Sequence, residues 1–181
     1  DIGCYTLGNG KPLDMTDTCL CMGADVTIAQ GLHRIEPEKV HFSFIGDSTF
    51  FASGITGVVN AVYNETDIVL IVLDNSTTAM TGHQPHPGTG VTMMDMVKKK
   101  DTNPKGEITH KISIEAVLKA VGVVSVEKVN PFELDKAIDA VKRAAQMKGV
   151  KAIIFKSPCI AVNKPKKAYT VSEKCIKCKK C

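Results

Sequence analysis

Short apolar runs alternate with segments of helical periodicity along most of the chain. Apolar runs typical of strands occupy residues 40–45, 67–73, 123–129 and 150–155. The run DIVLIVL at 67–73 is almost continuously apolar, as in a parallel strand that is covered on both faces. Helical patterns occupy residues 22–34, 51–63, 112–121 and 131–148, the last with Asn130 as its expected N-cap and Pro131 at its first position. This alternation predicts an α/β fold, with a mostly parallel sheet and helices on both faces.

Two polar stretches interrupt the alternation. Residues 74–90 are rich in glycine and proline and directly follow a predicted strand, and residues 98–111 predict a second exposed loop. Loops of this length in a compact domain are commonly functional. The chain begins as if at the exit of a strand and ends inside a cysteine motif, so we expect a fragment of a longer protein. We expect a domain over 1–163 that is truncated at its N-terminus, and a basic linker over 164–181 that starts a ferredoxin-like region and is disordered here.

The composition excludes several classes of protein. With 181 residues, 44% of them hydrophobic, and a net charge of +4, the chain is expected to form one folded domain. It has no run of about 18 apolar residues and no leader pattern, so neither a membrane span nor secretion is expected. Seven cysteines, an odd number, favour a reducing compartment, and we expect the cytoplasm. The lysine-rich tail holds Tyr169 as its one aromatic residue, which does not favour nucleic-acid binding.

Two polar motifs each follow a predicted strand. Gly46-Asp47-Ser48 follows the first strand, Asp74-Asn75 follows the second, and 27 residues separate Asp47 from Asn75. This separation accommodates one helix and a return strand, so the two motifs are expected about 5 Å apart at one edge of the sheet. Carboxylate and amide oxygens suit Mg²⁺, and the start of the following helix suits a diphosphate. Taken singly, each motif favours an ordinary helix N-cap or Asx turn, and it is their pairing at this spacing that favours the metal site.

The paired motifs resemble the bipartite motif of thiamine diphosphate enzymes, in which Gly-Asp-Gly and a later Asn frame Mg²⁺ and the diphosphate. This chain departs from that motif at Ser48, which replaces the second glycine. Four longer strings are similar to the large subunit of indolepyruvate ferredoxin oxidoreductase: DIGCYTLG, DTCLCMGADVTIAQGL, GDSTFFASGITGVVNAVYN and LDNSTTAMTGHQPHPGTG. The resemblance covers nearly the whole chain and implies the thiamine-diphosphate-binding fold.

The resemblance implies a set of site residues. The implied Mg²⁺ ligands are Asp47, Asn75 and the backbone carbonyl of Thr77. The other implied cofactor-binding positions are Gly46, Ser48, Thr49, Cys4, Cys21 and Met22. In this family the catalytic glutamate belongs to a separate pyrimidine-binding domain, so no acid–base residue is expected in this chain, and the fragment alone is expected to be inactive.

The resemblance also implies an activity and partners. The family oxidatively decarboxylates arylpyruvates to aryl-acetyl-CoA and passes electrons through iron–sulfur clusters to ferredoxin. The implied partners are a small (beta) subunit, the rest of the large subunit with its pyrimidine-binding domain, ferredoxin, CoA and the arylpyruvate, in an assembly expected to be dimeric. The alternatives are a pyruvate-type ferredoxin oxidoreductase, a non-oxidative thiamine-dependent 2-oxoacid decarboxylase, and a non-catalytic phosphate- or metal-binding module.

Cysteine spacing predicts a second kind of site. Cys175, Cys178 and Cys181 form CxxCxxC, which suits a [4Fe–4S] cluster in the intact protein, with zinc as the alternative. Cys19 and Cys21 diverge at this spacing, so we interpret them as small apolar core residues near the cofactor.

Two histidines lie in the loop after Asn75, in the string HQPHP. The prolines prevent a helix from aligning His83 and His86 as a metal pair, and exposure to solvent is the default expectation for histidines in a loop. For His83 a place in a lid over the substrate is the alternative. No G-x-G-x-x-G follows a strand, which excludes a dinucleotide fingerprint.

Overall fold

A four-stranded parallel sheet forms the centre of the domain in the computed structural model, which describes residues 1–92, 110–163 and 171–178. The strands are β1 (His41–Gly46), β2 (Ile68–Asp74), β3 (Ser125–Val129) and β4 (Val150–Lys156), in the order β1-β2-β4-β3. All three pairings are parallel. The predicted α/β fold with a parallel sheet is therefore confirmed, and the strands lie within two residues of their predicted ranges.

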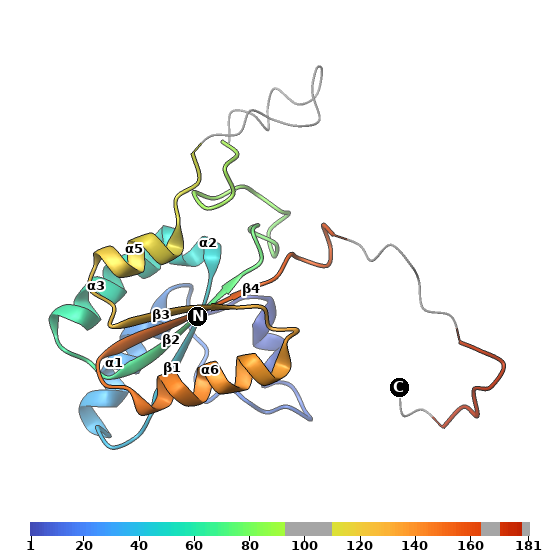
Figure 1. Ribbon diagram of the computed structural model, residues 1–181, viewed down its shortest axis with the longest axis horizontal. Coiled ribbons are helices and arrows are strands. Elements are labelled where there is room, and N and C mark those ends of the chain that lie inside the picture. Colours follow the sequence, from blue (N-terminus) through green and yellow to red (C-terminus); the bar gives the residue numbers. More distant parts are fainter. Residues whose placement is uncertain (93–109, 164–170, 179–181) are drawn as a thin grey trace.

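Helices cover both faces of the sheet (Figure 1). On one face lie α1 (Ala24–Ile35), α3 (Ile55–Tyr63) and α5 (Ile114–Ala120), and α6 (Leu134–Gln146) lies on the other. A hydrophobic core lies on each face of the sheet, and the residues of β2 contribute alternately to one and to the other. They alternate because successive side chains in a strand point to opposite faces. Leu70 packs with Val58 and Leu118 on the first face, and Ile71 packs with Ala140 on the second.

The helix expected from residue 51 begins earlier and is interrupted. The chain turns directly from β1 into α2 (Asp47–Thr49), passes through a π-helical segment (Phe50–Gly54) and continues as α3. A Cβ on Gly54 would lie 2.6 Å from Ile45 Cδ1, so glycine allows this segment to approach β1 closely. π-Bulges of this kind are frequent at functional sites.

Two expected helix starts differ in the structure. Asn130 is not the N-cap of α6: its side-chain oxygen accepts the N–H of Phe132 at 3.1 Å in an Asx turn, and α6 starts only at Leu134. α5 begins at Ile114, with Ser113 as its N-cap, because Ser113 Oγ accepts the N–H of Ala116 at 3.2 Å. Both differences arise because Asn and Ser side chains capture nearby backbone N–H groups.

Replacement of the α5 N-cap tests this helix start. Ser113→Ala is expected to lower the free energy of unfolding by about 1 kcal/mol, because it leaves an orphan N–H at the start of the helix. Ser113→Asp, which keeps an acceptor oxygen, should stay close to wild type. Urea denaturation followed by circular dichroism measures the difference. Equal losses in both variants would contradict the capping role.

The C-terminal segment lies apart from the sheet. Residues 171–178 are exposed, and the predicted linker lies partly outside the described residues, at 164–170 and 179–181. In the part of the chain that the structure describes, no helix is both long and apolar enough to cross a bilayer.

Candidate functional site

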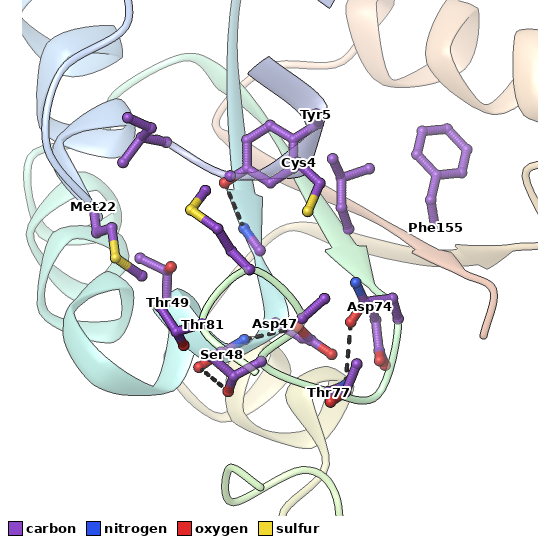
Figure 2. A pocket seen from close by; sticks show the side chains of 18 of the residues that line it. Cys4, Tyr5, Met22, Asp47, Ser48, Thr49, Asp74, Thr77, Thr81 and Phe155 are labelled. Atoms are coloured by element: carbon purple, nitrogen blue, oxygen red, sulfur yellow. Dashed lines mark hydrogen bonds between the residues drawn. The ribbon is translucent and has the colours of Figure 1, made fainter. Parts of the chain in front are cut away.

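A cavity of about 270 Å³ opens at the carboxyl ends of β1, β2 and β4 (Figure 2). Its walls come from the N-terminal segment, the β1–α2 turn, the loop after β2 and the end of β4. Gly46 pairs with Leu73, so the two sequence motifs continue from neighbouring strands into the same cavity. The expected meeting of Asp47 and Asn75 at one edge of the sheet is confirmed. Ligands bind at this edge in open α/β sheets.

Asp47 lines the cavity, and only 2% of the residue is exposed to solvent. Its Oδ1 accepts the N–H of Ser48 at 2.9 Å, and its Oδ2 accepts the N–H of Ser76 at 2.7 Å. Burial raises the pKa of this carboxyl, but the interactions with His86, followed by smaller ones with Asp74 and the Ser48 N–H, outweigh burial, so the net pKa is lowered. Asp47 is therefore a buried, ionised carboxylate surrounded by hydrogen-bond donors.

The loop after β2 wraps around Asp47. Ser76 has a φ of +61°, a conformation that costs a non-glycine residue energy, and its N–H reaches both Asp47 Oδ2 and Asp74 Oδ1. Thr78 Oγ1 donates to Ser48 Oγ at 2.7 Å, which fastens the loop to the β1–α2 turn. Strained backbone held by several such contacts is typical of a binding loop.

Asn75 and Asp74 have different partners. Asn75 Oδ1 accepts the N–H of Thr77 at 3.1 Å, which sets the orientation of the amide. Asp74 Oδ1 accepts from Lys156 Nζ at 2.6 Å and from the Ser76 N–H at 3.0 Å. The Asp74 charge is thus compensated by a lysine, whereas the Asp47 carboxylate faces neutral backbone donors and an imidazole.

His86 is the main correction to the sequence expectations. It is not exposed: its exposed fraction is 8%, and its Nε2 lies 3.1 Å from Asp47 Oδ2. The ring stacks on Phe51 with centroids 5.8 Å apart. The loop folds back on itself where the Thr78 N–H donates to the Gln84 carbonyl at 3.0 Å, and this second histidine points inward. His83, in contrast, is exposed, has a φ of +63°, and is not among the residues that line the cavity.

The N-terminal segment, which holds the expected residue Cys4, forms another wall and is held by two residues that the sequence did not single out, Asp1 and Tyr5. The carboxylate of Asp1 accepts the N–H of Gly23 at 3.0 Å and that of Gly46 at 3.1 Å, and it also accepts the Tyr5 hydroxyl. Tyr5 Oη accepts the Gly46 N–H at 3.1 Å, and burial, with smaller effects from nearby acidic groups, raises the pKa of the phenol. Together these bonds hold the N-terminal segment against the end of β1.

The structure brings most of the expected cofactor-binding residues together. Those that line the cavity are Cys4, Met22, Gly46, Asp47, Ser48, Thr49, Asn75 and Thr77. Cys21 is exposed and is not among them, which also corrects its interpretation as a core residue. Cys175 and Cys178 are exposed free thiols, and Cys181 lies outside the described residues.

The donor set fits a divalent cation with a diphosphate. Within residues 1–92, 110–163 and 171–178, no three His, Cys, Asp or Glu side chains gather to hold a metal, so a cation here needs other oxygens beside Asp47. Asn75 supplies an amide oxygen with a second lone pair, and Thr77 supplies a backbone carbonyl in the same cavity. Hard oxygens from protein and phosphate together are the usual environment of Mg²⁺.

Residues 1–155 match the family model described as "Thiamine pyrophosphate enzyme, C-terminal TPP binding domain". The chain belongs to this family. The match includes every residue of the cavity except Ser157. The thiamine-diphosphate-binding fold expected from the resemblance is thereby confirmed, and thiamine diphosphate is the cofactor class of the domain.

Curated relatives include two archaeal proteins named "Indolepyruvate oxidoreductase subunit IorA". That of Archaeoglobus fulgidus is 43% identical, and the match covers 100% of this chain and 28% of the relative. That of Methanothermobacter thermautotrophicus is 41% identical over the same shares. The resemblance to the large subunit of this oxidoreductase is confirmed, and the chain spans about 28% of the length of these relatives.

Solved structures share the fold. A 2-oxoglutarate:ferredoxin oxidoreductase from Magnetococcus marinus superposes with a TM-score of 0.61 at 15% identity, over 76% of this chain and 46% of that one. A thiamine diphosphate-dependent 4-hydroxybenzoylformate decarboxylase from Rhodococcus jostii superposes with a TM-score of 0.52 at 20% identity, over 76% and 23%.

Proposed function

We propose that this domain holds Mg²⁺ and the diphosphate of thiamine diphosphate within an enzyme that oxidatively decarboxylates arylpyruvates to aryl-acetyl-CoA and passes the electrons to ferredoxin. The observation that supports this proposal most strongly is that Asp47 and Asn75 reach the same cavity from neighbouring strands. The family match and the names of the curated relatives support the same assignment.

The chain's residues divide the task of holding the cofactor. Asp47, Asn75 and the carbonyl of Thr77 are the proposed Mg²⁺ ligands. Gly46, Ser48 and Thr49 line the cavity at the start of a helical stretch, the end of a helix that favours an anion. Cys4, Met22 and Tyr5 line the cavity on the side of the N-terminal segment.

When bound, thiamine diphosphate supplies a nucleophilic carbon for the 2-oxo group and an electron sink for the loss of carbon dioxide. The protein's contribution here is to fix the cofactor in place and to keep the cavity dry. Apolar walls serve the second purpose, since Leu73, Met80, Pro131 and Phe155 line the cavity beside the polar groups. No catalytic acid or base is assigned to this chain.

Electron transfer is proposed to use the cysteine motif. Cys175, Cys178 and Cys181 are the proposed ligands of a [4Fe–4S] cluster, and Cys175 Sγ accepts the N–H of Lys177 at 3.4 Å. Hydrogen bonds to sulfur are among the contacts that tune the potential of such clusters. The free thiols suit a reducing compartment, and we propose the cytoplasm.

The proposed partners are those that the family resemblance implies. They are a small subunit, the rest of the large subunit with a pyrimidine-binding domain, ferredoxin and CoA, in a dimeric assembly. A 2-oxoglutarate synthase subunit KorB from Methanocaldococcus jannaschii is 26% identical over 76% of this chain, so a different 2-oxoacid is the competing substrate.

Cofactor-linked stabilisation and turnover test the proposal. The full-length protein with its partner subunit, freed of cofactor by a chelator, is expected to show a rise in Tm when Mg²⁺ and thiamine diphosphate are added together. Indolepyruvate and phenylpyruvate should then reduce ferredoxin only when CoA is present, with a higher kcat/KM than pyruvate or 2-oxoglutarate.

The possible results separate the alternatives. CoA-independent release of an aldehyde would indicate a non-oxidative decarboxylase, and a preference for pyruvate would indicate a pyruvate-type enzyme. The absence of any cofactor-dependent rise in Tm would refute the cofactor site and favour a non-catalytic module.

A further inference from the structure

Both ring nitrogens of His86 are engaged in hydrogen bonds. Nδ1 accepts the backbone N–H of Gly88 at 3.1 Å, and Nε2 lies 3.1 Å from Asp47 Oδ2. A backbone N–H can only donate, so Nδ1 carries no proton. The ring is therefore the neutral tautomer with its proton on Nε2, and it donates that proton to the Asp47 carboxylate.

The His86 ring is held in this orientation from several sides. One face stacks on Phe51 at an interplanar angle of 28°. A Cβ on Gly88 would lie 3.0 Å from both His86 Cε1 and Phe51 Cε2, so the Gly88 backbone passes close to both rings. His86 itself is only 8% exposed. The Nε2 proton therefore has a fixed direction, toward Asp47.

This contact distinguishes the two oxygens of Asp47. Oδ2 receives two donors, the Ser76 N–H and the His86 Nε2–H. Oδ1 receives one, the Ser48 N–H, among the described residues. A carboxylate oxygen offers about two lone-pair sites. The oxygen with an unused site is thus Oδ1, and a rotation of the carboxylate out of its present plane would break both bonds to Oδ2.

We infer that His86 is a positioning residue: its Nε2–H holds Asp47 Oδ2 so that Oδ1 faces the metal of the cofactor. This inference rests on the proposed function. Hydrogen-bond partners of metal-ligating carboxylates fix ligand orientation, and their loss typically lowers metal affinity about 10- to 100-fold. His86 and Asp47 belong to segments 39 residues apart, so this contact also joins the loop after β2 to the β1–α2 turn.

Two substitutions of similar size test whether the hydrogen-bond donor of His86 matters. His86→Gln places an amide N–H near the position of Nε2, and His86→Met has the same length without a donor. In the full-length protein with saturating thiamine diphosphate, His86→Met is expected to raise the half-saturating Mg²⁺ concentration about tenfold, and His86→Gln should restore most of the affinity. Mg²⁺-dependent shifts in Tm give one readout. The second readout is the Mg²⁺ concentration that half-saturates turnover. At saturating Mg²⁺, His86→Met and His86→Gln should have the same kcat.

Two further variants control this comparison. His110→Met makes the same replacement at an exposed histidine and should match wild type in its Mg²⁺ dependence. Asp47→Asn removes the ligand charge itself. If Asp47→Asn loses the Mg²⁺ response while His86→Met and wild type bind Mg²⁺ equally, His86 has no positioning role and the cofactor site stands. If Asp47→Asn keeps the full response, the cofactor site itself is wrong.

A measurement on the wild-type protein covers the case in which His86→Met does not fold. After selective ¹⁵N-labelling of histidine, with His86→Gln used for assignment, the ring of His86 should show an unprotonated Nδ1 and a protonated Nε2. The opposite tautomer would overturn the inference, because Nε2 could then not donate to Asp47.

Discussion

Asp47→Asn is expected to abolish most of the cofactor-dependent stabilisation of the full-length protein. Asparagine keeps the shape of the side chain but removes its charge, and Mg²⁺ affinity depends strongly on ligand charge, so we expect a loss of about 100-fold. With ligand at about 100 times the wild-type Kd, linkage predicts about 2.7 kcal/mol of stabilisation for wild type and about 0.4 kcal/mol for the variant. Thermal melts with and without Mg²⁺ and thiamine diphosphate measure both values.

The matched control is Asp139→Asn, which makes the same change on the exposed side of α6. It should keep the full rise in Tm. An Asp47→Asn protein that is stabilised as much as wild type would show that Asp47 is not a metal ligand.

Asp67→Ala is expected to destabilise the domain by about 3 kcal/mol, because it leaves a buried ammonium without its partner. Lys151 is 1% exposed, and its Nζ donates to Asp67 Oδ1; the exposed Lys148 bridges the same carboxylate at 3.0 Å. The pair lies at the start of β2 and β4, at the opposite edge of the sheet from the cavity. Cofactor-dependent stabilisation should therefore be unchanged, while urea denaturation shows the loss.

The double variant Asp67→Ala/Lys151→Met provides the control. It removes the unpaired charge of Lys151 and should be more stable than Asp67→Ala alone, since replacing both members of a buried ion pair by apolar groups is often neutral in its effect on stability. If Asp67→Ala and the double variant are equally destabilised, the loss comes from packing and not from the unpaired lysine.

The same ion pair predicts a dependence of stability on pH. Burial raises the pKa of Asp67, but hydrogen bonds and charges from Lys151 and Lys148 outweigh burial, so its net pKa is lowered in the folded state. The contribution of such a group is present above the pKa of the unfolded chain, about 4, and is lost as the pH falls through the lower folded value. The stability difference between wild type and Asp67→Ala should therefore shrink below about pH 4.

Local patterns predicted the sheet well because each strand is covered on both faces or bounded by turn residues. DIVLIVL could only be a buried strand at this length, and its register with β1 places Asp74 beside Asp47. The start of α6 was less predictable. Asn130 can cap a helix or close an Asx turn with equal local chemistry, and the structure takes the turn.

Residues that act through distant contacts left no pattern in the sequence. Asp1 and Tyr5 meet Gly46 across more than 40 positions, and a single aspartate or tyrosine carries no spacing signal. Cys21 was expected near the cofactor but lies in an exposed turn, because neighbouring residues of a loop need not share a direction. The histidines of HQPHP differ for the same reason: one side chain faces solvent and the other meets Asp47.

The alternation of strands and helices along the chain, the paired motifs and their expected meeting at one edge of the sheet follow from the amino-acid pattern alone. Periodicity and turn chemistry are local properties, and parallel neighbours must end at the same edge. Only the tertiary structure shows which oxygen of Asp47 has an unused lone-pair site and that His86 is a donor to the other oxygen. That selection depends on how the loop after β2 folds back over the β1–α2 turn, and burial then makes each hydrogen bond strong enough to set an orientation.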